Sequence, residues 1–467
     1  MDITPTTIPM ELVEKYENIK GSFYTFYPHT GIWNESVTEK DYKSELISLI
    51  ENRPDTGIAV YLHFPHCPKQ CTFCQCYTVI SRDYDKAEKM VDYITKEIDL
   101  MAAFFNEHSF KPNIREVHFG GGSPSHLREK DVKKVLAKLN QFLNIDDLDE
   151  LCIEVDPRFE VDQNRMKFYA DSGFTRISFG IQDFDETVQN AVNRVHSFEQ
   201  VQDLILPEIR NRFKSFSIDL IYGLPHQTIE SFQKTIDLVK KLSPDRIALC
   251  VLGYRPDVFK FQKTISPDSL PDLKAREQIS RDAWRELINA GYERIGIDHF
   301  AKPTDDLSIA KKNGTLYRNA MGYTPGRYTE MMGFGPSAMG AIGDLYIQNI
   351  YGVEDYYEEI NQSKFSVFRG HKADKDCLIR RDILFNIIHY SQLEYETIEK
   401  KHSINFVEYF KNELDSLTEL EKDGLLTFTE AGFNLTSIGS RFQRQICLKF
   451  DTSAIYKHSR ETAHTKT

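Results

Sequence analysis

Short apolar runs alternate with longer amphipathic stretches through the first two thirds of the chain. The runs are rich in β-branched and aromatic residues, as buried strands are. Between them apolar residues return every three or four positions, which is the spacing of one helix face. The predicted strands are 58–64, 116–119, 151–155, 176–180, 217–222 and 246–251. The predicted helices are 83–105, 129–143, 185–211, 229–242 and 275–290.

This repeated strand–helix order predicts an α/β fold with a parallel sheet, because parallel neighbours need a long crossover connection and a helix is the usual one. Periodicity alone does not distinguish a doubly wound sheet from an incomplete barrel. In both architectures ligands bind at the carboxyl ends of the strands. We therefore expect the chemistry of the protein in the segments that directly follow the strands.

The segments outside this repeat predict further parts. Residues 1–55 contain an aromatic-rich stretch, 22–28, and residues 301–354 follow the last repeat. Helical patterns at 375–390, 394–401 and 407–421 lead into a hairpin pattern near 424–435, which indicates a winged-helix-like module. The charge around this module is mixed, so we expect a lid or packing role rather than DNA binding. The predicted domains are an N-terminal segment contributing to the site (1–55), a barrel (56–300), a barrel-edge and substrate segment (301–354) and a mainly helical C-terminal lid (355–467).

Composition narrows the class of protein. The chain has 467 residues, 40% of them hydrophobic, with a net charge of −12, which argues against nucleic acid or an anionic membrane as a partner. It contains no apolar run near the ~20 residues that span a bilayer, and its start lacks the basic and apolar regions of a secretory leader. Eight cysteines are too few for a disulfide scaffold, so we expect a cytoplasmic protein with reduced thiols.

Four cysteines directly follow the first predicted strand. The first three, Cys67, Cys71 and Cys74, have the spacing Cys-x3-Cys-x2-Cys, and Cys76 comes two residues later. Three thiolates on one loop can hold three irons of a 4Fe–4S cubane and leave the fourth iron open. Structural zinc would need four ligands, usually in two separated pairs. The spacing is typical of radical S-adenosylmethionine (SAM) enzymes, in which SAM completes the cluster and is cleaved to a 5′-deoxyadenosyl radical.

Polar and glycine residues follow the later strands. Gly120-Gly-Gly-Ser-Pro124 follows the second strand, and consecutive glycines let the backbone approach a ligand. Glu154 alternates with apolar residues in the third strand, where a buried carboxylate needs a partner. Gln182 follows the fourth strand, and Asp219 lies within the fifth. We expect these side chains to converge at one end of the sheet.

Many short motifs of this sequence resemble those of one protein family and occur in order along the chain. They are Tyr61-Leu-His-Phe-Pro65, the cysteine loop, Gly120-Gly-Gly-Ser-Pro124, Ile153-Glu-Val-Asp-Pro-Arg158, Gln182-Asp-Phe184, Val192-Asn-Arg194, Ile218-Asp-Leu-Ile-Tyr-Gly-Leu-Pro225, Gly296-Ile-Asp-His-Phe-Ala301, Arg318-Asn319, Gly322-Tyr-Thr324 and Asp376-Cys-Leu-Ile-Arg-Arg381. With the N-terminal Tyr24-Thr-x-Tyr-Pro28, the sequence resembles the oxygen-independent coproporphyrinogen III oxidases (coproporphyrinogen dehydrogenases), radical SAM oxidoreductases of haem biosynthesis, from about Glu14 to Phe450. The resemblance implies an incomplete (βα)6 barrel with an N-terminal extension.

The resemblance also implies a reaction and a site. The expected reaction converts two propionates of coproporphyrinogen III to vinyl groups without oxygen, using one 4Fe–4S cluster and two SAM. A monomer would act on this tetrapyrrole with an unidentified electron donor. The cluster ligands would be Cys67, Cys71 and Cys74, with Cys76 as a non-ligand. The first SAM would contact Tyr61, Gly121 and Glu154, and the second Phe73, Gly122, Ser123, Gln182, Arg194, Asp219, the backbone near Gly253 and the side chain of Met339.

Some positions depart from the family pattern and leave alternatives open. The family has Cys-Gly-Cys-Asn where this chain has Cys74-Gln75-Cys76-Tyr77. It has Tyr-Ala-His-Leu-Pro where this chain has Leu252-Gly-Tyr254-Arg-Pro256. The glutamine that the family has before Gly-Tyr-Thr is Met321 here. One alternative is a radical SAM methylase or cyclopropanase with the same two-SAM site. The other is a haem chaperone of the superfamily, whose His-Asn-x-x-Tyr-Trp motif is replaced here by Arg318-Asn-Ala-Met-Gly-Tyr323. Arg194, Arg255 or Lys302 are candidates for binding propionates, because Arg and Lys recognise carboxylates.

Overall fold

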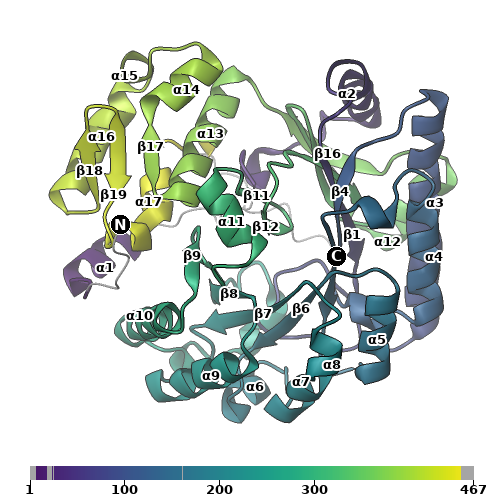
Figure 1. The fold of residues 1–467 in the computed structure, drawn as a ribbon, viewed down its shortest axis with the longest axis horizontal. Helices are drawn as coiled ribbons and strands as arrows, with labels where there is room; N and C mark the ends of the chain where they lie inside the picture. The colour runs from purple at the N-terminus through teal and green to yellow at the C-terminus, as the bar shows by residue number, and fades with distance from the viewer. Residues whose placement is uncertain (1–6, 18–23, 25, 160, 454–467) are drawn as a thin grey trace. The chain divides into compact units, whose positions relative to one another are not determined.

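The computed structural model describes residues 7–17, 24, 26–159 and 161–453, and it divides the chain into two compact units (Figure 1). The sheet unit consists of Asn34–Asp272 and Arg327–Lys372, and the helical unit of Met1–Trp33, Leu273–Gly326 and Ala373–Thr467. Each unit thus joins segments that are far apart in the sequence. The linear domain boundaries expected from the sequence stay a prediction. No helix in the described part of the chain is long and apolar enough to cross a membrane.

A large, mainly parallel sheet forms the centre of the sheet unit. Its parallel strands stand in the order β13-β1-β4-β5-β6-β7-β8, and the antiparallel β14, β15 and β16 continue it beyond β13. From β1 to β8 the strands of this sheet are neighbours in chain order, while the short β2 and β3 pair with each other in a separate sheet. This single winding is the strand order of an incomplete barrel, whereas a doubly wound sheet reverses its order at a switch point. The predicted α/β fold is confirmed.

All six predicted strands are present. The strands of the sheet unit are β1 (Ile58–Phe64), β2 (His66–Cys67), β3 (Val79–Ile80), β4 (Ile114–Gly121), β5 (Glu150–Val155), β6 (Arg176–Gln182), β7 (Ser215–Tyr222), β8 (Arg246–Val251), β13 (Glu330–Phe334), β14 (Met339–Ile342), β15 (Leu345–Asn349) and β16 (Val367–Lys372). β1 illustrates why the pattern predicted them well. Six of its seven residues are buried, as in strands covered on both faces, so it is a nearly continuous apolar run.

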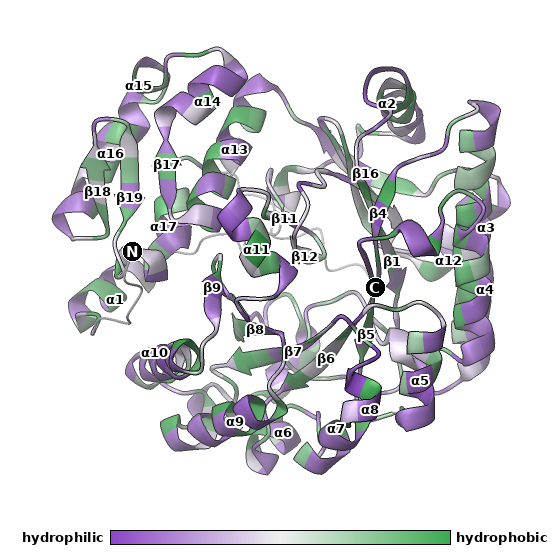
Figure 2. Ribbon diagram, in the orientation of Figure 1, coloured by the Kyte–Doolittle hydropathy of each residue, from purple (hydrophilic) through white to green (hydrophobic). Residues whose placement is uncertain are grey.

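The helices follow the predicted pattern with one correction. The sheet unit contains α2 (Glu39–Asn52), α3 (Tyr84–Glu107), α4 (Glu129–Leu139), α5 (Gln163–Asp171), α6 (Glu186–Ala191), α7 (Phe198–Leu204), α8 (Pro207–Arg210), α9 (Ile229–Leu242) and α12 (Val353–Asn361). The single helix predicted over 185–211 is wrong, because this stretch forms α6, α7 and α8. Asn193 has a φ of 57°, in the left-handed region, and Ser197 caps the next helix with a reciprocal capping box to Gln200. α3 and α9 carry both hydrophobic and hydrophilic residues, as helices with one buried face do (Figure 2).

A buried carboxylate fastens α3 to the turn between β13 and β14. Glu97 accepts hydrogen bonds from the backbone N–H of Gly335 (2.7 Å), from Asn349 (2.9 Å) and from the Tyr356 hydroxyl (2.7 Å). Its residue is only 3% exposed, so water cannot replace these partners easily. The turn that Glu97 holds leads directly into Met339, the first residue of β14.

Replacing Glu97 with alanine is expected to lower the free energy of unfolding by at least about 3 kcal/mol, because three donors would lose their acceptor and each unsatisfied buried group costs about 1–3 kcal/mol. Chemical denaturation followed by circular dichroism measures this change. The matched control is Glu107→Ala, an exposed glutamate of the same helix, which should change stability by less than about 0.5 kcal/mol. Equal effects of the two substitutions would contradict this role of Glu97.

The helical unit combines short strands with helices from three parts of the chain. Its helices are α1 (Met10–Glu17), α10 (Leu273–Asn289), α11 (Asp306–Asn313), α13 (Lys375–Tyr390), α14 (Tyr395–His402), α15 (Phe406–Tyr409), α16 (Lys411–Lys422) and α17 (Gln443–Cys447). Its strands are β9 (Glu293–Ile295), β10 (His299–Ala301), β11 (Tyr317–Asn319), β12 (Gly322–Thr324), β17 (Gln392–Glu394), β18 (Leu426–Thr429) and β19 (Gly432–Leu435). The last three form a small antiparallel sheet, so the expected hairpin is present; the winged-helix assignment stays a prediction.

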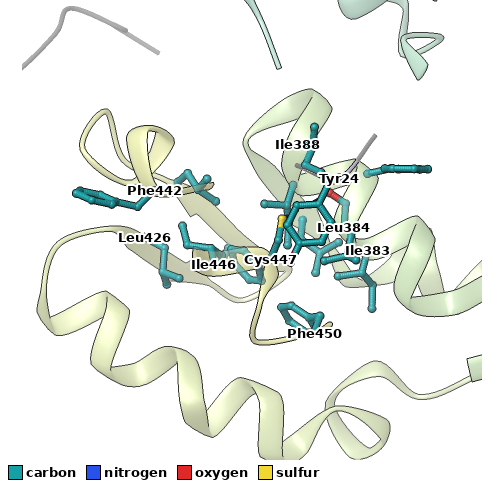
Figure 3. Close-up of a cluster of buried hydrophobic side chains, with 14 of the residues drawn as sticks. Tyr24, Ile383, Leu384, Ile388, Leu426, Phe442, Ile446, Cys447 and Phe450 are labelled. Carbon is teal, nitrogen blue, oxygen red and sulfur yellow. Dashed lines mark hydrogen bonds between the residues drawn. The ribbon is translucent and has the colours of Figure 1, made fainter. Parts of the chain in front are cut away.

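The core of the helical unit includes part of the N-terminal aromatic segment (Figure 3). Tyr24 is fully buried beside residues of α13 and α17, and its hydroxyl donates to Asp451 at 3.0 Å. Cys447 lies in the same core, as a small apolar residue would. Thr25 lies outside the described residues. Tyr24 therefore has a packing role, and a contribution of this segment to the site stays a prediction.

Candidate functional site

The cysteine loop follows β1 and is held by the segment after α6. Asn193 donates from its side chain to the carbonyl of Gln70 (2.6 Å), and Thr72 N–H donates to the carbonyl of Val192 (3.2 Å). Within the loop, Cys74 N–H donates to the carbonyl of Cys71 (3.2 Å). The guanidinium of Arg194 approaches the sulfur of Cys71 at 3.5 Å. The Val192-Asn-Arg194 motif therefore supports the loop that carries the three expected cluster ligands.

The thiols of this loop suit the iron–sulfur cluster expected from the sequence. Among the described residues all cysteines are free thiols, so none of the expected ligands is in a disulfide. The pKa of Cys67 is raised by burial and by the neighbouring Cys74 and Cys71, whereas a hydrogen bond from Cys76 lowers the pKa of Cys74 to about 7. A thiolate is the form that binds iron, so Cys76 favours the ligand form of its neighbour.

The described residues include no group of three or more His, Cys, Asp or Glu side chains arranged around one metal ion. The donor set of the loop is three thiols with a nearby guanidinium, and three thiolates on one loop can bind three irons of a 4Fe–4S cubane.

The side chains of Tyr61 and Glu154 come together beside Gly120. A Cβ atom on Gly120 would lie 2.8 Å from the Glu154 carboxylate and 2.8 Å from the Tyr61 ring, so only glycine leaves room for both. The Tyr61 hydroxyl lies 3.0 Å from Nδ1 of His63, whose Nε2 lies 3.0 Å from the carbonyl of Tyr77. Because a carbonyl only accepts, Nε2 carries the proton and Tyr61 donates to Nδ1. The Tyr61 hydroxyl oxygen is thus left as an acceptor for a ligand.

The glycine loop after β4 packs closely against the end of β1. Gly121 has a φ of 110°, and a Cβ atom on Gly122 would lie 2.5 Å from the carbonyl oxygen of Pro65. Gly122 N–H donates to the carbonyl of Phe64 (2.8 Å), and Ser123 N–H donates to that of His66 (3.1 Å). The loop therefore lies directly beside the strand that leads into the cysteines, as expected for a cradle shared by cluster and ligand.

A second group gathers at Gly180. A Cβ atom there would lie 2.7 Å from the Arg194 guanidinium and 3.2 Å from the Gln182 amide. Arg194 donates to the carbonyl of Gly180 and to Asp156 (3.2 Å). Asp219 is the β7 residue that pairs with Gly180. Gln182, Arg194 and Asp219, which the family resemblance assigns to the second SAM, therefore lie around one glycine.

Asp219 has an altered acidity. Burial, followed by the charge of Glu154, raises the pKa of Asp219 to about 6. The two carboxylates thus repel each other across the sheet interior, and a cationic or hydrogen-bonding ligand would relieve that repulsion.

Phe73 and Gly253 are also brought together. Gln262 donates to the carbonyls of both residues, at 3.3 and 3.0 Å. Gln75, one of the departures from the family pattern, donates to the same Gly253 carbonyl at 2.5 Å. Leu252, a second departure, packs like Phe73 against the apolar cluster of Val188, Val192 and Leu224. Two departures therefore lie at the positions expected to contact the second SAM.

The other candidates have different surroundings. Met339 begins β14 beside Gly333, which is the β13 residue paired with Tyr61. The guanidinium of Arg255 pairs with Asp257 and is partly exposed. Lys302 and Met321 belong to the helical unit, whereas all the expected cluster and SAM residues belong to the sheet unit.

Sequence reasoning missed two residues at this site. Asp156 accepts from Arg194 and from Arg158 (2.6 Å), and these two cations outweigh the effect of burial and lower the pKa of Asp156 to about 2. Asp156 lies inside the Ile153-Glu-Val-Asp-Pro-Arg158 motif, so this motif could have identified it as a site residue. His118 lies 2.9 Å from Glu154. Its position two residues before Gly120 was a signal too, because alternate strand residues face the same side.

Comparison with known proteins agrees with this geometry. Residues 61–239 match the model of the radical SAM superfamily. The chain is similar to oxygen-independent coproporphyrinogen III oxidase from Escherichia coli, with 34% identity over 443 residues, which is 95% of each protein. It is 33% identical to the protein of that name from Pseudomonas aeruginosa over 444 residues, covering 94% of this chain and 95% of the relative. The solved structure of the Escherichia coli coproporphyrinogen III oxidase, described as a radical SAM enzyme, superimposes with a TM-score of 0.87 at 33% identity, covering 96% of this chain and 99% of that one.

Proposed function

The chain belongs to the oxygen-independent coproporphyrinogen III oxidase family of the radical SAM superfamily, and we propose that it converts two propionates of coproporphyrinogen III to vinyl groups, giving protoporphyrinogen IX. Membership of the family implies a 4Fe–4S cluster and SAM. The observation that carries the proposal is the meeting of the cysteine loop, Tyr61, Glu154 and Arg194 at the carboxyl ends of neighbouring strands.

The cofactors would be held by this chain as follows. Cys67, Cys71 and Cys74 would bind three irons, and the first SAM would lie against Tyr61, Gly121 and Glu154. When bound, the cluster and SAM supply the radical that removes a hydrogen atom from a propionate. The contribution of the protein is to position the substrate and exclude water.

The second SAM would lie beside Gln182, Arg194 and Asp219. The shared position of these residues at Gly180 supports this part of the proposal. Arg194 is bound by Gly180 and Asp156, so its guanidinium is held in place before any ligand arrives. A preorganised guanidinium loses little conformational entropy on binding a carboxylate.

A specific observation favours one alternative, a two-SAM methylase or cyclopropanase acting on another substrate. Gln75 occupies the Gly253 carbonyl, which the family resemblance assigns to the second SAM. A side chain at this position narrows the space around Phe73 and Leu252 and can alter what fits there. The haem-chaperone alternative lacks such support, since the chain has Arg318 and Tyr323 where that group has histidine and tryptophan.

Anaerobic incubation of the cluster-loaded protein with coproporphyrinogen III, SAM and a reductant is expected to release CO2 and form protoporphyrinogen IX. Chromatography of the oxidised porphyrins measures the product, and 5′-deoxyadenosine measures SAM cleavage. The matched variant is Gln75→Gly, which should retain the activity if Gln75 only replaces a glycine of the family. Formation of 5′-deoxyadenosine without any vinyl product in both proteins would contradict the proposed reaction and favour the methylase-like alternative.

A further inference from the structure

His118 lies within the interior of the sheet unit, beside Glu154, a residue proposed to contact the first SAM. It is on β4, where it pairs across the strands with Cys152 of β5, and its residue is only 6% exposed. Its Nε2 lies 2.9 Å from the Glu154 carboxylate. Among the described residues, His118 is the one basic side chain within ion-pair distance of Glu154. Glu154 itself is more open, with 38% of its side chain exposed.

The surroundings of His118 favour its charged form. Burial lowers the pKa of a histidine, but Cys152 and Glu154 outweigh burial and raise the pKa of His118 to about 10. Glu150, on β5 with Cys152 and Glu154, and Asp219 on β7 add negative charge around His118. The ring centroid of Tyr61 on β1 lies 6.0 Å from that of His118. Arg176 of β6 adds one positive charge near the same Glu150, Cys152 and Asp219, so the acidic neighbours of His118 act against one nearby cation.

Other buried histidines of the same unit show that burial alone does not produce this state. For His196, burial and the nearby Arg194 lower the pKa to about 3. For His66, burial lowers it to about 4. His118 therefore differs from them through its acidic neighbours.

Two other buried cations of these strands, Arg176 and Arg246, are already paired with another carboxylate. Glu150 pairs with Arg176 (2.6 Å) and with Arg246 (3.0 Å) at the start of the strands. Neither arginine is within ion-pair distance of Glu154. A neutral His118 would leave Glu154 without an ion-pair partner beside the buried Asp219, whose own charge is still opposed by Arg176 and Arg194.

We propose that His118 is a positioning residue, an imidazolium that keeps Glu154 ionised and fixes its orientation toward the first SAM. This rests on the proposed function only for the identity of the ligand. A carboxylate anchored through one oxygen keeps the other to accept from ligand hydroxyl groups, such as those of a ribose.

Two measurements test the proposal on the cluster-loaded protein. In the first, 15N spectra of histidine-labelled protein report the ring charge between about pH 6 and 9. The His118 signal, assigned through its contact with the Tyr61 ring, is expected to keep two protonated nitrogens throughout, while the His196 signal stays neutral. A neutral His118 ring at about pH 7 would overturn the proposal, and this reading needs no variant.

The second measurement is SAM binding by equilibrium dialysis without reductant, so that SAM is not cleaved. His118→Gln keeps a hydrogen-bond donor but removes the charge. It is expected to weaken SAM binding about tenfold and to make binding weaken further as the pH falls, because Glu154 would then take up a proton. His108→Gln, at the end of α3, should behave as the wild type.

A double-substitution test separates this role from general packing. In the Glu154→Gln background, His118→Gln is expected to cause no further loss of SAM affinity. Equal losses with and without Glu154, or an unchanged pH profile in His118→Gln, would overturn the proposal. Failure of the wild type to bind SAM would instead contradict the proposed function.

Discussion

Replacing Cys67, Cys71 or Cys74 with serine is expected to abolish both the iron–sulfur absorbance and the cleavage of SAM. A hydroxyl is a much poorer ligand for iron than a thiolate, and each of the three cysteines would hold a different iron. The loop itself should remain folded, because Asn193 and Thr72 tie it to the segment after α6 through hydrogen bonds that involve no sulfur atom. Iron analysis, visible absorption and 5′-deoxyadenosine formation measure the effect.

The matched control is Cys76→Ser in the same loop. The cluster should assemble in this variant, because Cys76 is not an expected ligand and the serine hydroxyl can still donate a hydrogen bond to Cys74. Loss of iron from Cys76→Ser as complete as from the other three variants would show that the ligand assignment is wrong.

Replacing Asp219 with alanine is expected to reduce SAM binding from two equivalents to one while the cluster stays intact. Asp219 pairs with Gly180, around which Gln182 and Arg194 also lie, so its loss removes a polar contact from the proposed second site. Turnover should fall to below about 1% of the wild type, since mispositioning of reacting groups can cost about a hundredfold. Equilibrium dialysis and the porphyrin assay measure the two effects separately.

The acidity of Asp219 adds a dependence on pH. Its pKa is raised to about 6, so the carboxylate takes up a proton as the pH falls through that value. Binding of the second SAM to the wild type should therefore weaken below about pH 6, and Asp219→Ala should lack this change. Asp203→Ala, an exposed aspartate on α7, is the control and should bind two equivalents. A single equivalent in the wild type would contradict the two-SAM proposal.

The sequence predicted much of the candidate site because its residues belong to short motifs at strand ends. Tyr61, Glu154 and Asp219 lie on three strands whose apolar pattern was clear, and the ends of parallel strands meet at one edge. The meeting of Gln182 and Arg194 at Gly180 could not be predicted from spacing. It depends on the left-handed residue Asn193, which ends α6 and turns the chain back toward the cysteine loop.

The positions that depart from the family pattern show the same division between what the sequence predicts and what the structure adds. Gln75 and Leu252 are far apart in the sequence, and the family resemblance places both near the expected second SAM and substrate. The structure adds their contacts: Gln75 donates to the carbonyl of Gly253, and Leu252, like Phe73, packs against the apolar cluster of Val188, Val192 and Leu224.

By itself, the sequence determined the six parallel strands, most of the helices and the cysteine loop, because apolar periodicity and ligand spacing depend on residues close along the chain. The tertiary structure decided the single winding of the sheet, the pairing of β13 with β1 and the joining of distant segments into two units. It also decided the environments of Glu97 and His118. Strand pairing and the pKa of a buried group depend on neighbours from other elements, and such neighbours are defined only when the chain has folded.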